Sequence, residues 1–380
     1  QVASFDCSTV TDVPQIECEA LVALYNSTNG AGWWYKLNWL ETTTVGNWYG
    51  VSVTSGRISH IDLLADNLTG NIPSALGILT NLIYLGLNHN QITGVIPSFL
   101  GNLTNLWSLS LNDNFLTGSI PPELGGMTNL EQLNLYRNQL SGSIPASLGN
   151  LSKLRYLELW SNNLTGSIPS SLGGIPWLRR INLSNNQLSG SIPPELSIPP
   201  LEVLDLSNNQ LVGILPPELG SLIYLEHLYL QGNLFAGSIP LTFINLLDLG
   251  IFHFYDTSLC EPITPEYLAW KESISDYQGT GRLCPPPTGY QQKFLFVPLN
   301  WSGSQIEFES TATTQVNLFI DEVPLSGCRN QVLIEFLDVE TQNFDTFTCT
   351  VNPLNDIRIF VKNSTNYNPD DWDVVIGLAE

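Results

Sequence analysis

The sequence predicts an α/β repeat fold: a solenoid of stacked coils with a parallel sheet along one side, followed by a small all-β sandwich. Two observations carry this prediction. One asparagine slot recurs along most of the chain at a spacing of 24 residues, with a single step of 23. After Gly289 this repeat is absent, and short runs with alternating apolar residues follow. A fixed period is the signature of stacked structural units, and the later runs are typical of short antiparallel strands.

The slot holds an amide or acid side chain in eight coils and threonine in a ninth, degenerate coil: Asp66, Asn90, Asn114, Asn138, Asn162, Asn186, Asn209, Asn233 and Thr257. A deletion at 197–200 explains the shorter step. The shared pattern is L-x-L-x-x-N-x-L-x-G-x-I-P. Its two leucines alternate as in a strand, and the asparagine can hydrogen-bond backbone groups that a tight bend leaves unpaired. Gly and Pro then turn the chain.

This pattern resembles the leucine-rich repeat family, in the subclass with LtGxIP repeats known from plant receptor ectodomains and polygalacturonase-inhibiting proteins. The resemblance covers about residues 15–284. It implies a right-handed, curved solenoid with a concave parallel sheet, an extra strand near each LTG segment, and binding as the usual activity. Plant caps commonly place cysteines around the W-x-G-V motif, where this chain has Asn47 and Val53.

We expect four segments along the chain. A helical pattern containing Cys18 and Leu21 precedes the first coil. Thr264 with Pro265 begins a second helical pattern after the last coil, and this pattern continues to Tyr277. Both would cover open ends of the solenoid. The expected segments are an N-terminal cap at 1–56, repeats at 57–256, a C-terminal cap at 257–284 and a β-sandwich or jelly roll at 285–380.

Composition narrows the classes of partner. The 380 residues include 13 Lys and Arg against 35 Asp and Glu, a net charge of −22, and 13% of residues are charged. Nucleic acids and anionic membranes need clustered positive charge, so both are excluded as main partners. No apolar run approaches the roughly 18 residues of a spanning helix. We predict no nucleic-acid binding and no membrane insertion.

Six cysteines form three local pairs: Cys7 with Cys18, Cys260 with Cys284, and Cys328 with Cys349. The lack of C-x-x-C metal spacing favours disulfides, with reduced structural thiols as the alternative. The sequence starts at Gln1 without a charged and apolar leader, as a secreted chain does after its signal peptide is removed. We expect an extracellular protein, secreted or at the cell surface.

Side chains at the outward positions of the predicted sheet do not belong to the hydrophobic core, so they are candidates for binding a ligand. Aligned coils place Tyr136 and Trp160 in one outward column, and Tyr156 and Arg180 in another. Between 131 and 185, five basic residues face two acidic ones. Aromatic faces beside guanidinium groups suit a protein or carbohydrate ligand, the alternative being that Arg and Trp stack on each other. The candidate binding residues are Trp107, Tyr136, Arg137, Arg155, Tyr156, Trp160, Arg179 and Arg180.

Catalytic and metal-binding chemistry is weakly supported. The four histidines are scattered over different coils, and the common nucleophile, zinc and phosphate-loop motifs are absent from the sequence. Glu158 and Asp205 would lie two strands apart, a spacing also found between glycosidase carboxylates, but two solvated acids are the simpler interpretation. A solvated turn is likewise preferred over calcium binding at Asp370, Asp371 and Asp373. We predict a protein without enzymatic activity, metal or cofactor.

The sequence contains eight N-x-S/T sequons, several of which arise from the repeat itself: Asn26, Asn67, Asn102, Asn150, Asn163, Asn182, Asn300 and Asn363. Some would carry a glycan in an N-glycosylating host. Asn182 is expected to point into the candidate binding surface, where a glycan would close that surface.

Three functions are compatible with these observations. We favour a recognition or adhesion protein that binds a protein or glycan through its concave face. A self-assembling subunit of an extracellular filament or surface layer is the alternative, since few side chains are charged and a β-rich module could dock on a neighbouring copy. Inhibition of a secreted polysaccharide-degrading enzyme is a weaker alternative.

Overall fold

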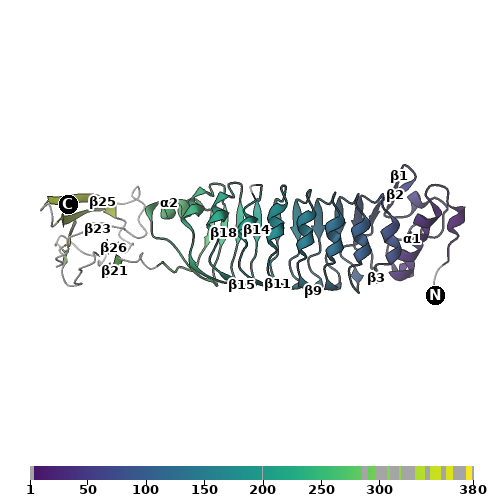
Figure 1. Cartoon of the computed structure of the whole chain (residues 1–380), viewed down its shortest axis with the longest axis horizontal. Coiled ribbons are helices and arrows are strands. Elements are labelled where there is room, and N and C mark those ends of the chain that lie inside the picture. Colours follow the sequence, from purple (N-terminus) through teal and green to yellow (C-terminus); the bar gives the residue numbers. More distant parts are fainter. Residues whose placement is uncertain are drawn as a thin grey trace. The chain divides into compact units, whose positions relative to one another are not determined.

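The computed structural model describes residues 4–198 and 200–284 with their side chains and, after residue 284, the backbone of the strands. The chain forms two compact units: Gln1–Leu259 with Ile274–Thr280, and Cys260–Ser273 with Gly281–Glu380. The first unit contains the coils, which stack one behind another as Figure 1 shows.

An 11-stranded sheet, here called the long sheet, runs through the whole stack of coils. Its first two strands are antiparallel and all the others pair in parallel. In spatial order its strands are β1 (Val51–Thr54), β2 (Arg57–Asp62), β4 (Tyr84–Gly86), β6 (Ser108–Ser110), β8 (Gln132–Asn134), β10 (Tyr156–Glu158), β12 (Arg180–Asn182), β14 (Val203–Asp205), β16 (His227–Tyr229), β18 (Ile251–His253) and β20 (Asp276–Gln278).

A second row of short parallel strands follows the LTG segments, as the resemblance implied. Figure 1 labels several of them along one edge of the stack. This second sheet comprises the pair β3 (Thr69–Gly70) and β5 (Gln91–Ile92), and the series β7 (Thr117–Ser119), β9 (Gln139–Ser143), β11 (Asn163–Gly166), β13 (Gln187–Gly190), β15 (Gln210–Gly213), β17 (Leu234–Ser238) and β19 (Ser258–Cys260). An isolated bridge between Val95 and Thr117 links the pair to the series.

In eight coils a short 3-10 helix directly follows the I-P dipeptide, or L-P at Leu215 and Pro216, and the proline occupies the N-cap. Proline fits there because its fixed φ suits the turn and its missing N–H needs no partner. These helices are η4 (Ser74–Ile78), η5 (Ser98–Asn102), η6 (Pro122–Gly126), η7 (Ala146–Asn150), η8 (Ser170–Gly174), η9 (Pro194–Leu196), η10 (Pro217–Ser221) and η11 (Leu241–Asn245).

The asparagine ladder ties the coils together between the two sheets. Asn114 Oδ1 accepts from the Ile92 amide at 2.9 Å, and its Nδ2 donates to the Leu87 and Leu111 carbonyls at 2.9 and 3.1 Å. Each ladder asparagine therefore bonds its own coil and the preceding one. Leucines such as Leu133 are fully buried beside the ladder. Burial of a leucine side chain contributes about 2 kcal/mol, so the repeated leucines supply most of the driving force.

The residues before the first coil contain helix α1, a disulfide and a cluster of aromatic rings from Tyr25, Trp33, Trp39 and Trp48. The helices of this segment are η1 (Cys7–Thr9), α1 (Gln15–Ser27), η2 (Gly30–Gly32) and η3 (Val45–Asn47). The predicted Cys7–Cys18 disulfide is present. The buried Glu17 carboxylate binds Arg57 at 2.7 Å and accepts from the Ile58 amide at 2.8 Å. These contacts fix α1 to strand β2.

At the other end, helix α2 spans Pro265–Ser273, and the predicted Cys260–Cys284 disulfide is present. The helical pattern was expected to continue to Tyr277. Instead, Asp276–Gln278 form strand β20 and extend the long sheet. The Tyr277 ring packs against Phe252 at 5.8 Å and Phe254 at 5.4 Å, and this aromatic contact favours the strand over another helical turn.

Beyond residue 284 the strands form two antiparallel sheets of three and four strands. The order is β21-β26-β23 in one and β22-β27-β24-β25 in the other. Their bounds are β21 Tyr290–Leu295, β22 Ile306–Phe308, β23 Val316–Asn317, β24 Asn330–Asp338, β25 Asn343–Val351, β26 Ile357–Lys362 and β27 Val374–Leu378. The predicted Cys328–Cys349 pair and the acids Asp370, Asp371 and Asp373 lie outside the residues whose side chains are described.

Candidate functional site

The long-sheet face comprises the outward side chains of the long sheet and of the residues that directly follow each strand. From β4 to β18 the central residue of each strand, leucine in most of them, is buried, and its two neighbours point to the other side of the sheet. Tyr156 is in register with Gln132 on one side and Arg180 on the other. Because the register is parallel, equivalent positions of successive coils form continuous columns. Neighbouring residues of one column lie about 4.8 Å apart.

Two of the predicted aromatic residues form a stack on this face. Tyr136 and Trp160 occupy the same column on neighbouring coils, and their rings lie 4.5 Å apart with an interplanar angle of 7°. Both are half-buried. Trp107 and Tyr156 are 40% and 37% exposed and do not take part in the stack. The stack gives the face a flat, rigid aromatic surface.

All four predicted arginines are bound to carboxylates of a neighbouring coil, with 45–60% of each arginine side chain exposed. Lys153, the fifth basic side chain, donates to Asn129 Oδ1 at 2.7 Å. The pairs are Arg137–Asp113 at 2.9 Å, Arg155–Glu131 at 3.0 Å, Arg179–Glu202 at 2.5 Å and Arg180–Glu158 at 2.7 Å.

The positive excess expected between 131 and 185 is therefore neutralised locally. Asp113 and Glu202 lie one coil outside that window, so a count along the sequence leaves them out. The alternative of arginine stacking on tryptophan also differs from the structure. Among the described residues of this face, Tyr136 and Trp160 stack on each other and the arginines bind acids.

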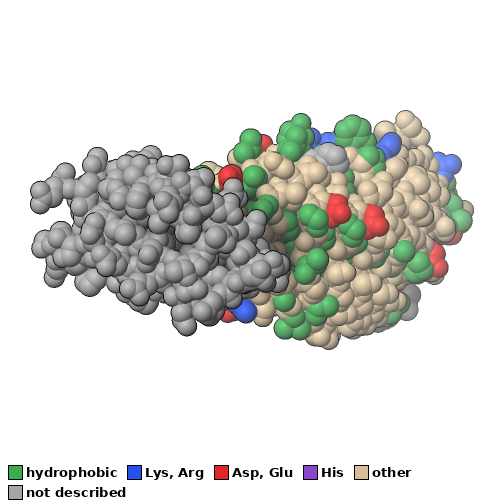
Figure 2. All heavy atoms as spheres, turned by 60° about the vertical axis from the view of Figure 1, so that its left-hand side comes forward, with side chains coloured by type: hydrophobic (Ala, Val, Ile, Leu, Met, Phe, Trp, Pro, Cys, Tyr) green, Lys and Arg blue, Asp and Glu red, His purple; other side chains and the backbone are tan. Residues whose placement is uncertain are grey.

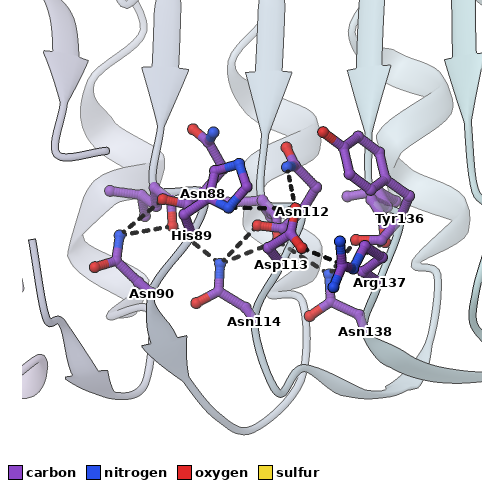
Figure 3. Close-up of polar contacts among 12 residues, drawn as sticks. Asn88, His89, Asn90, Asn112, Asp113, Asn114, Tyr136, Arg137 and Asn138 are labelled. Carbon is purple, nitrogen blue, oxygen red and sulfur yellow. Dashed lines mark hydrogen bonds and ion pairs between the residues drawn. The ribbon is translucent and has the colours of Figure 1, made fainter. Parts of the chain in front are cut away.

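Figure 3 shows how one row of polar contacts runs along the solenoid beside the ladder. Asp113 contacts His89 Nδ1 at 3.5 Å, Arg137 Nε at 2.9 Å and the Asn112 amide at 2.9 Å. His89, Asp113 and Arg137 share a left-handed backbone, with φ of 56°, 55° and 52°. Such φ values cost about 1–3 kcal/mol per residue, which the following ladder asparagine offsets through its hydrogen bonds.

Partly desolvated acids lie next to the aromatic stack. Burial raises the pKa of the Glu158 carboxyl, the Arg180 charge opposes that rise, and the charge of Asp205 adds to it. Glu158 and Asp205 flank Asn182 in register on neighbouring strands. Burial, followed by the charge of Asp113, also raises the pKa of the Tyr136 hydroxyl. This part of the face therefore combines aromatic surface with carboxylates that are only partly hydrated.

The sequence reasoning missed a second surface. The second-sheet face comprises the three outward positions of each x-L-T-G-x segment, at which the side chains are exposed or half-exposed. None of these positions in the eight coils holds Lys, Arg, His, Asp or Glu. The signal was present in the LTG and LSG repeats, whose outward residues are short and uncharged. Figure 2 shows one side of the described residues, where Lys, Arg, Asp and Glu side chains are few among hydrophobic and other uncharged groups.

The sequons fall in different environments. Asn163 is exposed on the second-sheet face, and Asn102 and Asn150 are exposed on 3-10 helices. Asn26 and Asn67 are half-buried, and Asn300 and Asn363 lie outside the described residues. Asn182 lies on the long sheet as expected, but it is 8% exposed and accepts hydrogen bonds from Ser184. A glycan at Asn182 would have to displace this packing.

Within the part of the chain that the structure describes, no group of three or more His, Cys, Asp or Glu is arranged to hold a metal ion. Its described helices are too short or too polar to cross a membrane.

Family models identify the repeat. Models described as Leucine rich repeat match residues 80–140, 128–188 and 224–246, and one for Leucine Rich repeats in two copies matches 176–219. The coils are leucine-rich repeats. These matches agree with the resemblance seen in the sequence and with the parallel sheets of the structure. No curated protein matches the sequence.

Solved structures with this fold include two plant receptors. The plant peptide hormone receptor RGFR1 in complex with RGF2 is 39% identical over 56% of this chain and 34% of its own, with a TM-score of 0.54. The ectodomain of the receptor kinase GASSHO1/SCHENGEN3 from Arabidopsis thaliana, in complex with CASPARIAN STRIP INTEGRITY FACTOR 2, is 33% identical over 67% of this chain and 34% of its own, with a TM-score of 0.60. The chain thus spans about a third of the length of both receptors.

A third similar structure is a plant ice-binding protein. It is 25% identical, with a TM-score of 0.55, and the match covers 73% of this chain and 100% of that protein.

Proposed function

We propose that this protein recognises a protein partner by binding an extended segment of it across the long-sheet face. The similarity to receptor ectodomains that bind peptide ligands carries the proposal. The proposed contact residues are the eight predicted from the sequence: Trp107, Tyr136, Arg137, Arg155, Tyr156, Trp160, Arg179 and Arg180.

The chemistry of the face supports a peptide over an acidic glycan. The Tyr136–Trp160 stack offers a rigid surface for an apolar or aromatic side chain. A guanidinium has five N–H donors, so Arg155 and Arg180 keep donors for peptide carbonyls while they bind Glu131 and Glu158. Because these pairs are neutral, an acidic polymer gains little from them.

The remaining parts of the proposal concern location and architecture. We infer an extracellular, non-catalytic protein. The two disulfides before and after the coils are typical of oxidising compartments, and the similar GASSHO1/SCHENGEN3 structure is an ectodomain. The antiparallel strands beyond residue 284 support a terminal β-sandwich. Adhesion, self-assembly into a filament, carbohydrate binding and inhibition of a polysaccharide-degrading enzyme stay predictions from the sequence.

A random peptide library displayed on phage tests the proposal. We expect peptides enriched on the wild-type protein to lose about 2 kcal/mol, or roughly thirtyfold in Kd, on Trp160→Ala, since aromatic hot spots dominate such interfaces. The matched control is Trp177→Ala, which removes a 62% exposed tryptophan three residues before strand β12. Failure to enrich any peptide that distinguishes Trp160→Ala from Trp177→Ala would contradict the proposal.

We propose ice binding as a second function, on a different surface. The specific observation is a sheet face without charge in a chain of net charge −22. The match to a plant ice-binding protein over the whole of that protein supports it.

A further inference from the structure

The three outward columns of the second-sheet face are rich in hydroxyl and amide groups. The first column is Asn67, Gln91, Phe115, Gln139, Asn163, Gln187, Gln210 and Leu234. The second is Thr69, Thr93, Thr117, Ser141, Thr165, Ser189, Val212 and Ala236. The third is Asn71, Val95, Ser119, Ser143, Ser167, Ser191, Ile214 and Ser238. The long-sheet face of the same coils carries all four arginine–acid pairs described above.

Strand register sets these side chains on a regular grid. Thr165 lies opposite Ser143 on one neighbouring strand and Gln187 on the other. Ser141 is likewise paired with Ser119 and Asn163. Such a grid repeats at about 4.8 Å from strand to strand.

The grid is also low in relief. Between the second and third columns stands a glycine with positive φ, for example Gly142 at 75° and Gly166 at 78°. Glycine adopts this backbone without strain and adds no side chain to the surface. A Cβ on Gly166 would lie 3.4 Å from Ser143 Cβ, so the serines pack close against the neighbouring backbone.

Hydroxyls in the central coils are free to bind external groups. In the first coils, Thr93 donates to Asn71 at 3.1 Å and Gln91 donates to Asn67 at 2.7 Å. By contrast, within the described part of the chain, no protein group hydrogen-bonds the side chains of Ser141, Ser143, Thr165, Ser167, Ser189 or Ser191. These six residues form a polar panel on the second-sheet face. Exposed Val95 and Phe115 border the panel on one side, and exposed Val212, Ile214 and Leu234 border it on the other.

We infer that this panel, Ser141–Ser191 on the second-sheet face, is the surface that binds ice; the inference rests on the second proposed function. Each hydroxyl both donates and accepts, and so does each water molecule of the ice lattice. Ice offers no counter-charge, so a charged side chain pressed against it would lose hydration without compensation. The absence of charge thus complements a neutral crystalline partner.

Other occupants fit less well. Flat polysaccharides are commonly bound by aromatic rings, and the only aromatic residue among the three columns is Phe115 at the border of the panel. A second copy of the chain would be expected to bury the apolar borders rather than the polar centre.

Ice recrystallisation and thermal hysteresis assays test the inference, using full-length protein from a host that does not glycosylate asparagine, since Asn163 lies beside the panel. The test variant is the double substitution Ser143→Lys and Thr165→Lys. The matched control is Ser170→Lys, which adds a charge on exposed helix η8 of the same coil. Melting curves check folding, and Ser189→Lys replaces the double variant if that variant unfolds.

We expect the wild type and Ser170→Lys to be active and the panel variant to lose its activity. Activity that survives in the folded panel variant would overturn the inference while leaving ice binding in place. An inactive wild type would overturn both. Light scattering adds one further outcome: a wild-type dimer that the panel substitutions dissociate would show that a second copy covers this face, which also overturns the inference.

Discussion

The two exposed sheet faces of the solenoid are built from the same coils but have opposite chemistry. On the long-sheet face, Arg155 and Arg180 bind acids and Tyr136 stacks on Trp160. On the second-sheet face, short uncharged residues repeat from coil to coil. Between them lies one ladder whose bonds recur in each coil. The ladder therefore fixes the spacing of both faces, while the outward residues of each sheet decide what that face can bind.

The first prediction tests whether one ladder supports both faces. Asn138→Ala should cost about 3 kcal/mol of the free energy of unfolding, because it leaves the buried Leu116 amide without its partner and removes one of two asparagine hydrogen bonds from each of the Leu111 and Leu135 carbonyls. Chemical denaturation measures this cost. The control is Asn163→Ala, an exposed asparagine for which we expect a change below about 0.5 kcal/mol. Equal costs would contradict the role of the ladder.

The second prediction concerns the end of the ladder, where Asp66 replaces asparagine. The Leu87 carbonyl accepts from both Asn90 and Asn114, whereas the equivalent Leu63 carbonyl accepts from Asn90. Asp66 Oδ2 is buried without a partner among the described residues. Asp66→Asn should therefore add about 1–2 kcal/mol of stability at neutral pH by donating to Leu63.

The same substitution should alter the pH dependence of stability. Burial raises the pKa of the Asp66 carboxyl above its ordinary 3.8, although the Tyr35 and Trp34 amides and Lys36 oppose that rise. The contribution of this carboxyl is fully present below the ordinary value and is lost as pH rises through the raised pKa. In denaturation curves across mildly acidic pH, Asp66→Asn should lack this loss. If the wild type and Asp66→Asn lost the same stability as pH rises, the Asp66 carboxyl would not be the cause of that loss.

The third prediction tests the coupling of the aromatic stack on the long-sheet face. A double-mutant cycle with Tyr136→Ala and Trp160→Ala should give a coupling energy of about 1 kcal/mol. Trp107 is two coils away from Trp160, so Trp107→Ala combined with Trp160→Ala should be additive within about 0.5 kcal/mol. Additivity in both cycles would mean that the stack is not formed in solution.

The smallest predicted effect is a difference between the two faces in how the cost of a substitution depends on salt concentration. Arg155→Ala should cost less than about 1 kcal/mol, because its pair with Glu131 is exposed, and the cost should shrink as salt rises. Ser143→Ala on the uncharged face should show no salt-dependent cost. Denaturation at low and high salt measures both. A cost for Arg155→Ala that does not change with salt would contradict the ion pair.

Much of the fold follows from the sequence because one period repeats. The slot from Asn90 to Asn233 predicted the ladder, and the L-x-L motif predicted the long sheet. Strand β20 was missed because Asp276–Gln278 carry no repeat motif and depend on the contact of Tyr277 with Phe252. Such a contact between distant segments leaves no periodic signal.

The candidate site was predictable in its columns, whereas one of its ion pairs was not. Equal positions on adjacent coils are about 4.8 Å apart, so stacking of Tyr136 on Trp160 follows from the register. The acids that bind Arg137 and Arg179 are Asp113 and Glu202, which stand at the same repeat position as their arginines in the neighbouring coil. The pair of Arg180 with Glu158 joins different repeat positions, so it depends on side-chain conformations that the alignment of coils does not give.

The most direct test of the account is a crossed binding measurement on two variants, Trp160→Ala and Ser143→Lys/Thr165→Lys. Library-selected peptide affinity and ice recrystallisation inhibition are measured on both. We predict that Trp160→Ala weakens peptide binding and keeps ice activity, whereas the panel variant loses ice activity and keeps peptide binding. If either folded variant lost both activities, or neither variant lost one, two separate binding faces on one ladder would be contradicted.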